Sequence, residues 1–358
     1  MVHHLTKDQA RRLIVRAQLL DYDRPVDVVE VAEQLGYLKI DPTATIATAE
    51  HTILWSRIGY PYEPGQLKKA AEEDRTLFEY DGTFRPSSLL PYMLPVMRAT
   101  TFRARGKEWF DANKDFARGI LKRLDKEGPL LASEFDDTSK MAIYTEGWDS
   151  TNQVPRMLEA LARLGKVAIV RREGRLRVWD LAERVYPQDL PEYDAEEAGR
   201  LHAERRLQAA GIAKEKSPWT RAATAGEAAT VEGSKWKWRV DPAALESLDD
   251  DPGGRVAILN PYDTTLFDRP RLKEVFEFEY VLEQFKPKSQ RIYGYFAHPI
   301  LIGDTFAGLL DAELDKKRDV LRVNAIHELR PWEPEEQEMV HAELEDLARW
   351  LGVPVAGL

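Results

Sequence analysis

Two ionisable side chains, Lys39 and Asp41, stand one residue apart between apolar neighbours in the stretch from Gly36 to Pro42. On a β-strand this spacing places both side chains on one face and Ile40 on the other. A carboxylate and an amine held on one face form a candidate for chemistry on a polar substrate. The alternative is structural, because Asp before Pro is a common helix N-cap and a lysine on a short strand is usually solvated.

The neighbouring sequence predicts the elements that position this pair. A preceding amphipathic helix is indicated by four apolar residues at helical spacing, Val28, Val31, Ala32 and Leu35. Gly36 is typical of a helix end, and Asp41-Pro42 is typical of the cap and first turn of another helix. A helix, a short strand and a helix in this order indicate a winged-helix unit.

Two further elements are expected near this end of the chain. Thr6-Lys7-Asp8-Gln9 is a capping-box pattern, and apolar residues follow it at helical spacing, which predicts a helix from about Lys7 to Leu20. Thr52 to Arg57 precedes the turn Gly59-Tyr60-Pro61, and we expect a strand there.

Composition restricts the class of protein. The chain has 358 residues, no Cys and seven His, and beyond the adjacent pair His3-His4 these show no metal-ligand spacing. We therefore expect no metal site and no disulfide. No apolar run approaches the ~18 residues of a membrane span, and the N-terminus lacks a basic region followed by an apolar core. We expect a cytoplasmic, nucleoid-associated protein that does not bind membranes.

The net charge of -10 argues at first against nucleic-acid binding, because affinity for phosphate comes from clustered Lys and Arg. The charge is unevenly distributed, however. Between Arg98 and Asp180 there are 17 Lys and Arg against 13 Asp and Glu, and acidic residues concentrate between Glu333 and Asp346. A basic middle with acidic ends is compatible with a protein that presents one face to DNA.

The middle of the chain has the clearest pattern. Apolar periodicity predicts one helix that ends near Gly128, a second over Leu130–Phe135 and a third over Thr151–Leu164. Lys166 to Trp179 is predicted to form a β-hairpin that turns at Glu173-Gly174. Three helices and a basic hairpin are typical of a winged helix.

The hairpin would carry four arginines at its tip, and the third helix would bring polar residues to a groove of DNA. The alternative is a winged helix that contacts protein or acts as a spacer, with a solvated tip. The crowding of arginines favours DNA contact. The predicted contacts are Arg171, Arg172, Arg175 and Arg177 from the hairpin and Asn152, Gln153 and Arg156 from the helix.

The last third of the chain changes character. A helix carrying Leu201 and Leu207 is expected first, and Lys235-Trp236-Lys237-Trp238-Arg239 then predicts either a basic wing or a strand with one aromatic face. From Gly253 onward the apolar period is two, and a final helix is expected over Pro334–Leu351. The predicted strands are Val256–Leu259, Glu277–Leu282, Arg291–Phe296, Pro299–Ile302, Phe306–Leu310 and Val320–Ile326.

The predicted fold class is therefore α+β, with tandem winged-helix (helix-turn-helix) units followed by a C-terminal antiparallel β-barrel. We expect four parts. Residues 1–115 would form a first winged helix with a helical extension and the candidate active site, 116–190 a second winged helix, 191–252 a third, and 253–358 the barrel with the C-terminal helix.

Several motifs fit one family. The C-terminal half has Asn260-Pro261-Tyr262-Asp263 and Tyr293-Gly294-Tyr295, and the N-terminal half has Ile40-Asp41-Pro42, Leu54-Trp55-Ser56-Arg57-Ile58-Gly59 and Phe78-Glu79-Tyr80. Taken alone, Phe78-Glu79-Tyr80 favours a buried aromatic anchor at an edge. Together these motifs resemble the winged-helix DNA glycosylases of the AlkZ/YcaQ type over nearly the whole chain. The resemblance implies a concave DNA-binding surface and removal of N7-alkylated purines or unhooking of interstrand crosslinks.

The family's catalytic signature is Gln, an aliphatic residue, then Gln or Asp. By resemblance it falls on Lys39, Ile40 and Asp41, with Lys39 in place of the usual Gln. Relatives usually continue after Phe-Glu-Tyr with Trp-Ala-His, whereas Asp81 follows Tyr80 here. Arg57 lies in a matched motif, and we include it among the residues expected to contact DNA.

The chemistry that the resemblance implies needs few groups. An N7-alkylguanine is positively charged and leaves readily, so the protein must mainly stabilise an oxocarbenium-like sugar and place a water. Asp41 is the candidate for both tasks, and Lys39 would hold a phosphate or the water, or stabilise the charged form of Asp41. We expect a monofunctional DNA glycosylase without metal or cofactor, acting on double-stranded DNA with alkylated or crosslinked purines. The alternative is a non-catalytic winged-helix DNA-binding protein, such as a regulator or lesion sensor.

Overall fold

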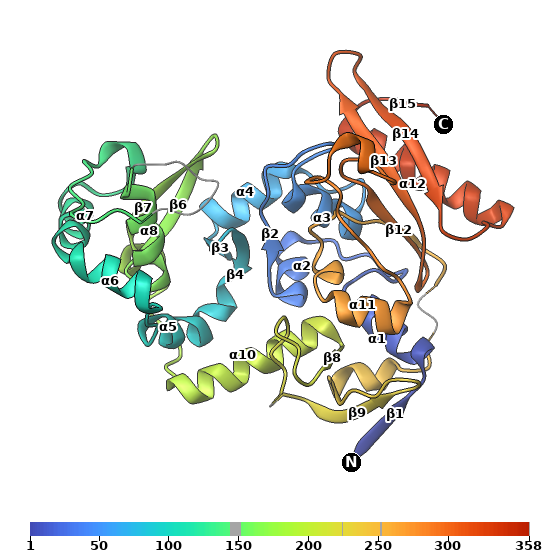
Figure 1. Ribbon diagram of the computed structural model, residues 1–358, viewed down its shortest axis with the longest axis horizontal. Coiled ribbons are helices and arrows are strands. Elements are labelled where there is room, and N and C mark those ends of the chain that lie inside the picture. The colour runs from blue at the N-terminus through green and yellow to red at the C-terminus, as the bar shows by residue number, and fades with distance from the viewer. Residues whose placement is uncertain (144–151, 224, 251–252, 358) are drawn as a thin grey trace. The chain divides into compact units, whose positions relative to one another are not determined.

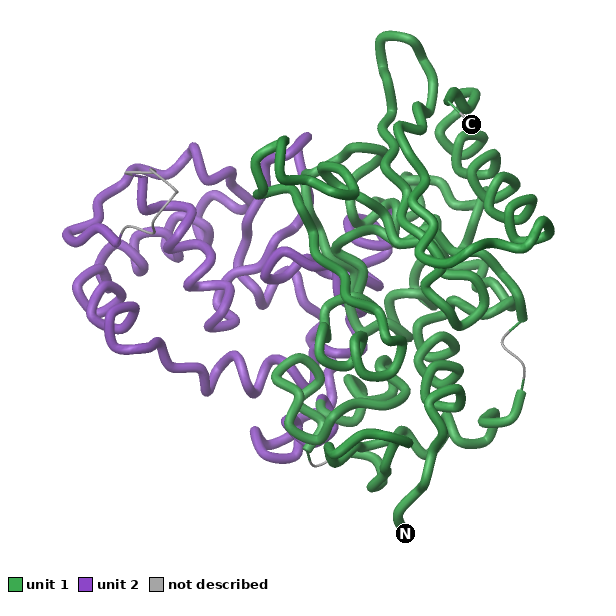
Figure 2. The backbone as a smooth tube through the Cα atoms, turned by 45° about the vertical axis from the view of Figure 1, so that its right-hand side comes forward, with its two compact units in different colours: residues 1–68, 203–358 green, residues 69–202 purple. Residues whose placement is uncertain are grey.

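The structure is a computed structural model of mixed α+β type that describes residues 1–143, 152–223, 225–250 and 253–357 (Figure 1). Two compact units can be distinguished (Figure 2): unit 1 is made of residues 1–68 and 203–358, and unit 2 of residues 69–202. The predicted four-part division stays a prediction. None of the described helices combines the length and the apolar character needed to cross a bilayer.

The N-terminal elements confirm two helices and correct two local predictions. α1 begins with the predicted capping box, in which the Thr6 hydroxyl accepts from the Gln9 N–H (3.1 Å). α2 ends at Gly36, whose φ of 74° is left-handed. The elements are β1 (Val2–Leu5), α1 (Lys7–Ala17), α2 (Val28–Leu35), β2 (Leu38–Lys39), α3 (Ala49–Ile58) and α4 (Pro64–Glu72).

The strand predicted over Thr52–Arg57 is wrong, because these residues lie within α3. All of them are buried, so no polar face reveals a helical period, and their β-favouring side chains misled the prediction. The helix start predicted at Asp41-Pro42 is also wrong. Both residues lie in a loop, and α3 begins at Ala49 after Thr48.

A four-stranded sheet of unit 1 has the order β1-β9-β10-β8, with β1 parallel to β9. Trp238 is buried in β10, whereas Trp236 is half exposed just before it, so the two indoles of the tryptophan and lysine stretch have different environments. The elements are α10 (Ala195–Ala210), β8 (Ile212–Lys214), β9 (Glu227–Val231), β10 (Trp238–Val240) and the 3-10 helix η3 (Ala243–Ser247).

The C-terminal sheet has the order β11-β12-β13-β14-β15. Its first four strands are antiparallel, as predicted, and β15 adds parallel to β14, which makes a half-barrel instead of a closed barrel. The predicted C-terminal helix is confirmed at both ends. The elements are β11 (Val256–Ile258), η4 (Thr264–Leu266), α11 (Arg269–Phe276), η5 (Lys288–Gln290), β12 (His298–Ile302), β13 (Thr305–Asp315), β14 (Val320–Glu328), α12 (Pro334–Leu351) and β15 (Val355–Ala356).

The strands predicted over Glu277–Leu282 and Arg291–Phe296 are wrong. The whole segment between α11 and β12 is described, and it contains only the 3-10 turn η5. Two of its alternating aromatic residues, Phe278 and Tyr280, pack in the core at the start of the segment without forming a strand.

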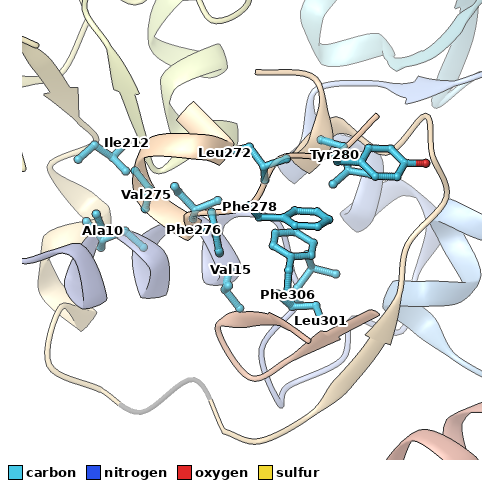
Figure 3. Packing of buried hydrophobic residues seen from close by; sticks show 14 of the residues in the cluster. Ala10, Val15, Ile212, Leu272, Val275, Phe276, Phe278, Tyr280, Leu301 and Phe306 are labelled. Carbon is cyan, nitrogen blue, oxygen red and sulfur yellow. The ribbon is translucent and has the colours of Figure 1, made fainter. Parts of the chain in front are cut away.

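The main core of unit 1 joins the two ends of the chain. Ala10 and Val15 of α1 pack in one cluster with Val275 and Phe276 of α11 (Figure 3). Phe278 stacks on Phe306 of β13 with ring centroids 4.3 Å apart. Burial of this apolar surface explains why residues 1–68 and 203–358 fold as one unit.

In unit 2 the predicted hairpin is confirmed, as β6 and β7 pair antiparallel around Gly174. The predicted helix over Leu130–Phe135 is wrong, because this stretch is β5 and a single 3-10 turn. The third predicted helix begins at Val154, and its expected first residue, Thr151, lies outside the described residues. The elements are β3 (Leu77–Tyr80), β4 (Thr83–Pro86), η1 (Ser87–Leu89), α5 (Leu90–Arg98), α6 (Ala104–Ala112), α7 (Lys114–Glu127), β5 (Leu130–Leu131), η2 (Ala132–Glu134), α8 (Val154–Arg163), β6 (Val167–Glu173), β7 (Leu176–Leu181) and α9 (Ala182–Val185).

Candidate active site

Asp41 is held in a fixed conformation directly after β2. Its Oδ1 accepts a hydrogen bond from the backbone N–H of Thr43 (2.9 Å), which is an Asx turn. Its carbonyl accepts from the N–H of Ala49 (3.4 Å), and its own N–H donates to Glu50 at the start of α3 (3.4 Å). The carboxylate is therefore partly exposed but oriented by its own loop.

The expectation that Lys39 and Asp41 share one face of a strand is wrong, because β2 ends at Lys39 and Asp41 lies in the turn beyond it. Lys39 is partly buried at the end of the strand, and the preceding Leu38 is fully buried. Only Ile40 separates the two residues in sequence. The two groups thus stay local neighbours, although the pleat of a strand does not align them.

Tyr262 of the Asn260–Asp263 motif is a polar group whose ionisation the charge of Asp41 influences. Its hydroxyl accepts from Nε2 of Gln284 (2.6 Å). Burial raises the pKa of Tyr262, and the negative charge of Asp41 raises it further, while hydrogen bonds to Gln284 and Thr43 oppose the change. A neutral phenol therefore lies within the electrostatic reach of the Asp41 carboxylate.

A second polar cluster lies on the first turn of α3. Oε1 of Glu50 accepts from the Thr48 hydroxyl (2.8 Å), and Nδ1 of His51 lies 2.6 Å from the Tyr62 hydroxyl. Burial lowers the pKa of His51, although the charge of Glu50 acts in the opposite direction. At neutral pH the imidazole is thus uncharged and suited to hydrogen bonding. No role was predicted from the sequence for Glu50, His51 or Tyr262, and only the Asn260–Asp263 motif around Tyr262 carried a signal.

Arg57 supports the site from within the core. Both of its side-chain Nη atoms bind the Asp263 carboxylate, with Nη2 to Oδ1 at 3.0 Å, and both residues are completely buried. Nε of Arg57 also donates to the carbonyl of Gln18 (3.1 Å). The expected DNA contact by Arg57 is therefore corrected: a guanidinium without exposed surface cannot reach a phosphate, and its role here is to join α3 to the Asn260–Asp263 motif.

The predicted wing arginines of unit 2 divide into two pairs. Nε and Nη2 of Arg172 bind the Glu79 carboxylate (both 2.6 Å), and Nε of Arg177 binds it at 2.8 Å. Arg171 pairs with Glu173 at the tip (2.6 Å). Arg175 is exposed and makes no ion pair within the part of the chain that the structure describes.

These contacts explain much of the arginine crowding. Glu79 is 6% exposed, and two guanidinium groups neutralise its buried charge. Phe78 beside it is also buried, in agreement with a buried anchor at this motif. Arg171 and Arg175 are the two exposed arginines of the hairpin, so the predicted phosphate contact of Arg172 and Arg177 would require them to leave Glu79.

Two polar residues at the start of α8 accept hydrogen bonds from backbone N–H groups of unit 2. Oδ1 of Asn152 accepts from the N–H of Val154 (2.9 Å). Gln153 is fully buried, and its Oε1 accepts from the N–H of Ile143 (3.1 Å), so the expected DNA contact by Gln153 is corrected. Asn152 is exposed and Arg156 is partly exposed, and both stay predicted contacts.

No group of three or more His, Cys, Asp or Glu side chains suited to a metal ion occurs within residues 1–143, 152–223, 225–250 and 253–357. The absence of a cofactor stays a prediction. Asp41 and Lys39 lie in unit 1, whereas the α8 and hairpin residues lie in unit 2.

Comparison with known proteins agrees with this architecture. The model of the AlkZ-like DNA glycosylase family matches residues 32–350. Among solved structures, the Streptomyces sahachiroi DNA glycosylase AlkZ is similar with a TM-score of 0.64 and 16% sequence identity, covering 99% of each chain. At this identity the likeness shows a shared fold along the whole chain.

Proposed function

The chain belongs to the AlkZ-like DNA glycosylase family, and from this premise we propose that it hydrolyses the N-glycosidic bond of N7-alkylated purines in double-stranded DNA. Crosslinks between such purines are included as substrates. The observation that carries the proposal is the Asp41 carboxylate, which a turn of its own loop holds partly exposed at the position of the family signature.

The reaction needs one carboxylate and one water. As the bond between N9 and C1′ breaks, the cationic purine leaves as a neutral base and positive charge develops on the sugar. Oδ1 of Asp41 is held by Thr43, and Oδ2 accepts no hydrogen bond from any described residue. That oxygen can stabilise the sugar cation and orient the water whose oxygen bonds to C1′, while the water's proton passes to the carboxylate or to solvent.

Tyr262 and Lys39 have supporting roles in this proposal. The raised pKa of Tyr262 keeps its hydroxyl protonated, so it can donate a hydrogen bond to the water or to a phosphate. Lys39 supplies a cation two residues from Asp41 for a phosphate of the damaged strand. The mechanism needs no metal or cofactor, because the alkylated base already carries the positive charge that makes it leave.

The elements of unit 2 support DNA binding by a winged helix. α7, β5, α8, β6 and β7 follow one another in that order, and their sheet has the order β5-β7-β6. In this arrangement α8 is the recognition helix and the β6–β7 hairpin is the wing. The exposed Arg171 and Arg175 would bind phosphates, and Asn152 and Arg156 would lie at a groove.

The test is the product released by the wild-type protein. DNA containing 7-methylguanine should yield the free base in single turnover, with strands that break only after alkali, because no covalent intermediate forms. A duplex with a nitrogen-mustard crosslink should separate into two strands on denaturation. Tight binding of either DNA without release of base would instead establish the alternative, a lesion sensor or regulator on the same scaffold.

A further inference from the structure

The segment between α11 and β12, residues 277–297, exposes large apolar side chains beside the candidate site. Phe285 is 89% exposed and Ile292 is 69% exposed. Most exposed apolar residues are isolated and need no explanation, but a group of them on one segment indicates a binding surface. Val281 and Tyr295 of the same segment are also exposed.

A buried carboxylate holds the segment in shape. Glu283, 3% exposed, accepts from the backbone N–H groups of Ile292 (2.7 Å) and Tyr293 (2.8 Å) and from Nζ of Lys286 (2.9 Å). Burial alone would raise the pKa of Glu283, but these hydrogen bonds keep it below the usual range. Arg291 adds a bond from Nε to the carbonyl of Lys286 (3.0 Å). The two limbs that carry Phe285 and Ile292 are thus tied together.

Both ends of the segment are anchored in unit 1. Phe278 and Tyr280 belong to the core, and the Tyr280 hydroxyl donates to the carbonyl of Ala297 (2.8 Å), which closes the base of the loop. Near its end Gly294 has a φ of 116°, and a Cβ there would lie 2.5 Å from the Asp311 carboxylate. Only glycine therefore lets the returning limb lie this close to β13.

The tip is connected to the candidate active site through one residue. Gln284 donates its Nε2 hydrogen to the Tyr262 hydroxyl, the same hydroxyl whose pKa the Asp41 charge raises. Phe285 follows Gln284 directly. The backbone that carries the exposed Phe285 is thus tied, through Gln284, to the hydroxyl that the charge of Asp41 influences.

The charges of the segment suit a polyanion. The segment has three cations, Lys286, Lys288 and Arg291, and past Val281 its single acidic residue is the buried Glu283. The two acids at its start, Glu277 and Glu279, form ion pairs with Lys7 and Lys273. The guanidinium of Arg291 lies over the ring of the exposed Tyr295, 4.9 Å from its centroid. Apolar side chains framed by cations match a nucleic acid, whose phosphates flank stacked bases.

We propose that Phe285, assisted by Ile292, is a wedge that inserts between base pairs at the lesion and fills the space that the damaged nucleotide leaves as it moves toward Asp41. This inference rests on the proposed glycosylase function and adds the group that opens the duplex. Unstacking and unpairing a nucleotide is costly, and an apolar side chain that takes its place in the stack offsets part of that cost. A rigid loop makes the insertion less costly because its shape is already fixed.

The first experiment measures opening of the duplex without catalysis. Protein carrying Asp41→Asn would be bound to duplex DNA with 2-aminopurine beside a 7-methylguanine, and fluorescence would report unstacking. We expect fluorescence to rise, to stay near the level of free DNA when Phe285→Ala is added, and to recover largely with Phe285→Leu. Val26→Ala is the matched control, because Val26 is an 83% exposed apolar residue elsewhere in unit 1. An equal rise with and without the Phe285 ring would overturn the wedge.

The second experiment measures excision. In otherwise wild-type protein, Phe285→Ala should slow single-turnover release of 7-methylguanine from duplex roughly 10- to 100-fold, but release from the same strand without its complement by no more than about twofold. Equal loss on both substrates would assign Phe285 to the site itself and contradict the proposal. If the wild type releases no base from either substrate, the glycosylase function fails, while the fluorescence result still decides whether Phe285 opens DNA.

Discussion

Replacement of Arg57 by Met tests the assignment of this residue to the core. The substitution keeps a long side chain but removes both bonds to Asp263 and the bond to the Gln18 carbonyl. Asp263 still accepts hydrogen bonds from the backbone N–H (2.9 Å) and the hydroxyl (2.7 Å) of Thr265. Its negative charge, however, is left buried without a cation. Removal of one partner from such a pair costs about 3–5 kcal/mol.

The measurement is the free energy of unfolding in urea, followed by circular dichroism. At roughly 2–4 °C per kcal/mol for a unit of this size, the thermal midpoint should fall by roughly 6–20 °C. Adding Asp263→Asn should restore about 1–3 kcal/mol, because the unpaired charge is removed while an amide oxygen can still accept from Thr265. The salt dependence of DNA affinity should not change, since Arg57 touches no phosphate.

A cost of less than about 1 kcal/mol for Arg57→Met would show that the pair is not buried and charged as described. A lowered salt slope at unchanged stability would restore the original expectation of a phosphate contact. Either result would refute the reasoning for Arg57.

Three further outcomes are expected. Joint replacement of Arg171 and Arg175 by Ala should lower the slope of log affinity against log salt by at most about two, and an unchanged slope would show that the hairpin tip does not contact phosphates. Arg172→Ala should mainly destabilise the fold, because it weakens the neutralisation of Glu79. Burial lowers the pKa of His298 to about 4, so the unfolded state binds the proton more readily and stability falls as pH drops from 6.5 toward 4. The free energy of unfolding, followed through urea midpoints, should be about 2 kcal/mol lower at pH 5 than at pH 8 in the wild type, and this loss should be absent in His298→Leu. An equal loss in the variant would exclude His298 as the cause. Borohydride should trap no covalent adduct with DNA, and an adduct lost in Lys39→Ala would show that the amine attacks the sugar.

Elements with local signals could be predicted from the sequence. The capping box at Thr6, the Gly174 turn of the hairpin and Pro334 in the first turn of α12 each encode their structure within a few residues. The Asx turn of Asp41 is local as well. It was mistaken for a helix cap because the same side-chain acceptor serves both structures.

Features that depend on distant partners could not be predicted. Arg57 and Asp263 are 206 residues apart, and Arg172 and Glu79 are 93 apart, so the two arginines, which serve the fold, were expected to contact DNA instead. In the segment that Glu283 holds together, side-chain bonds to the backbone replace the strands that its alternating aromatics predicted. The local sequence around an arginine does not indicate which distant carboxylate it will pair with.

The central claim is that the Asp41 carboxylate performs base excision, and Asp41→Asn tests it most directly. Asn retains the oxygen that accepts from Thr43, so the turn should persist while the charge beside the sugar is lost. Single-turnover release of 7-methylguanine should slow by about 10²-fold or more, with DNA affinity nearly unchanged. Asp27→Asn, which alters another aspartate that caps by the same kind of bond, should leave the rate as in the wild type. If Asp41→Asn retained most of the wild-type rate, Asp41 would be only a turn residue and the active site would lie elsewhere.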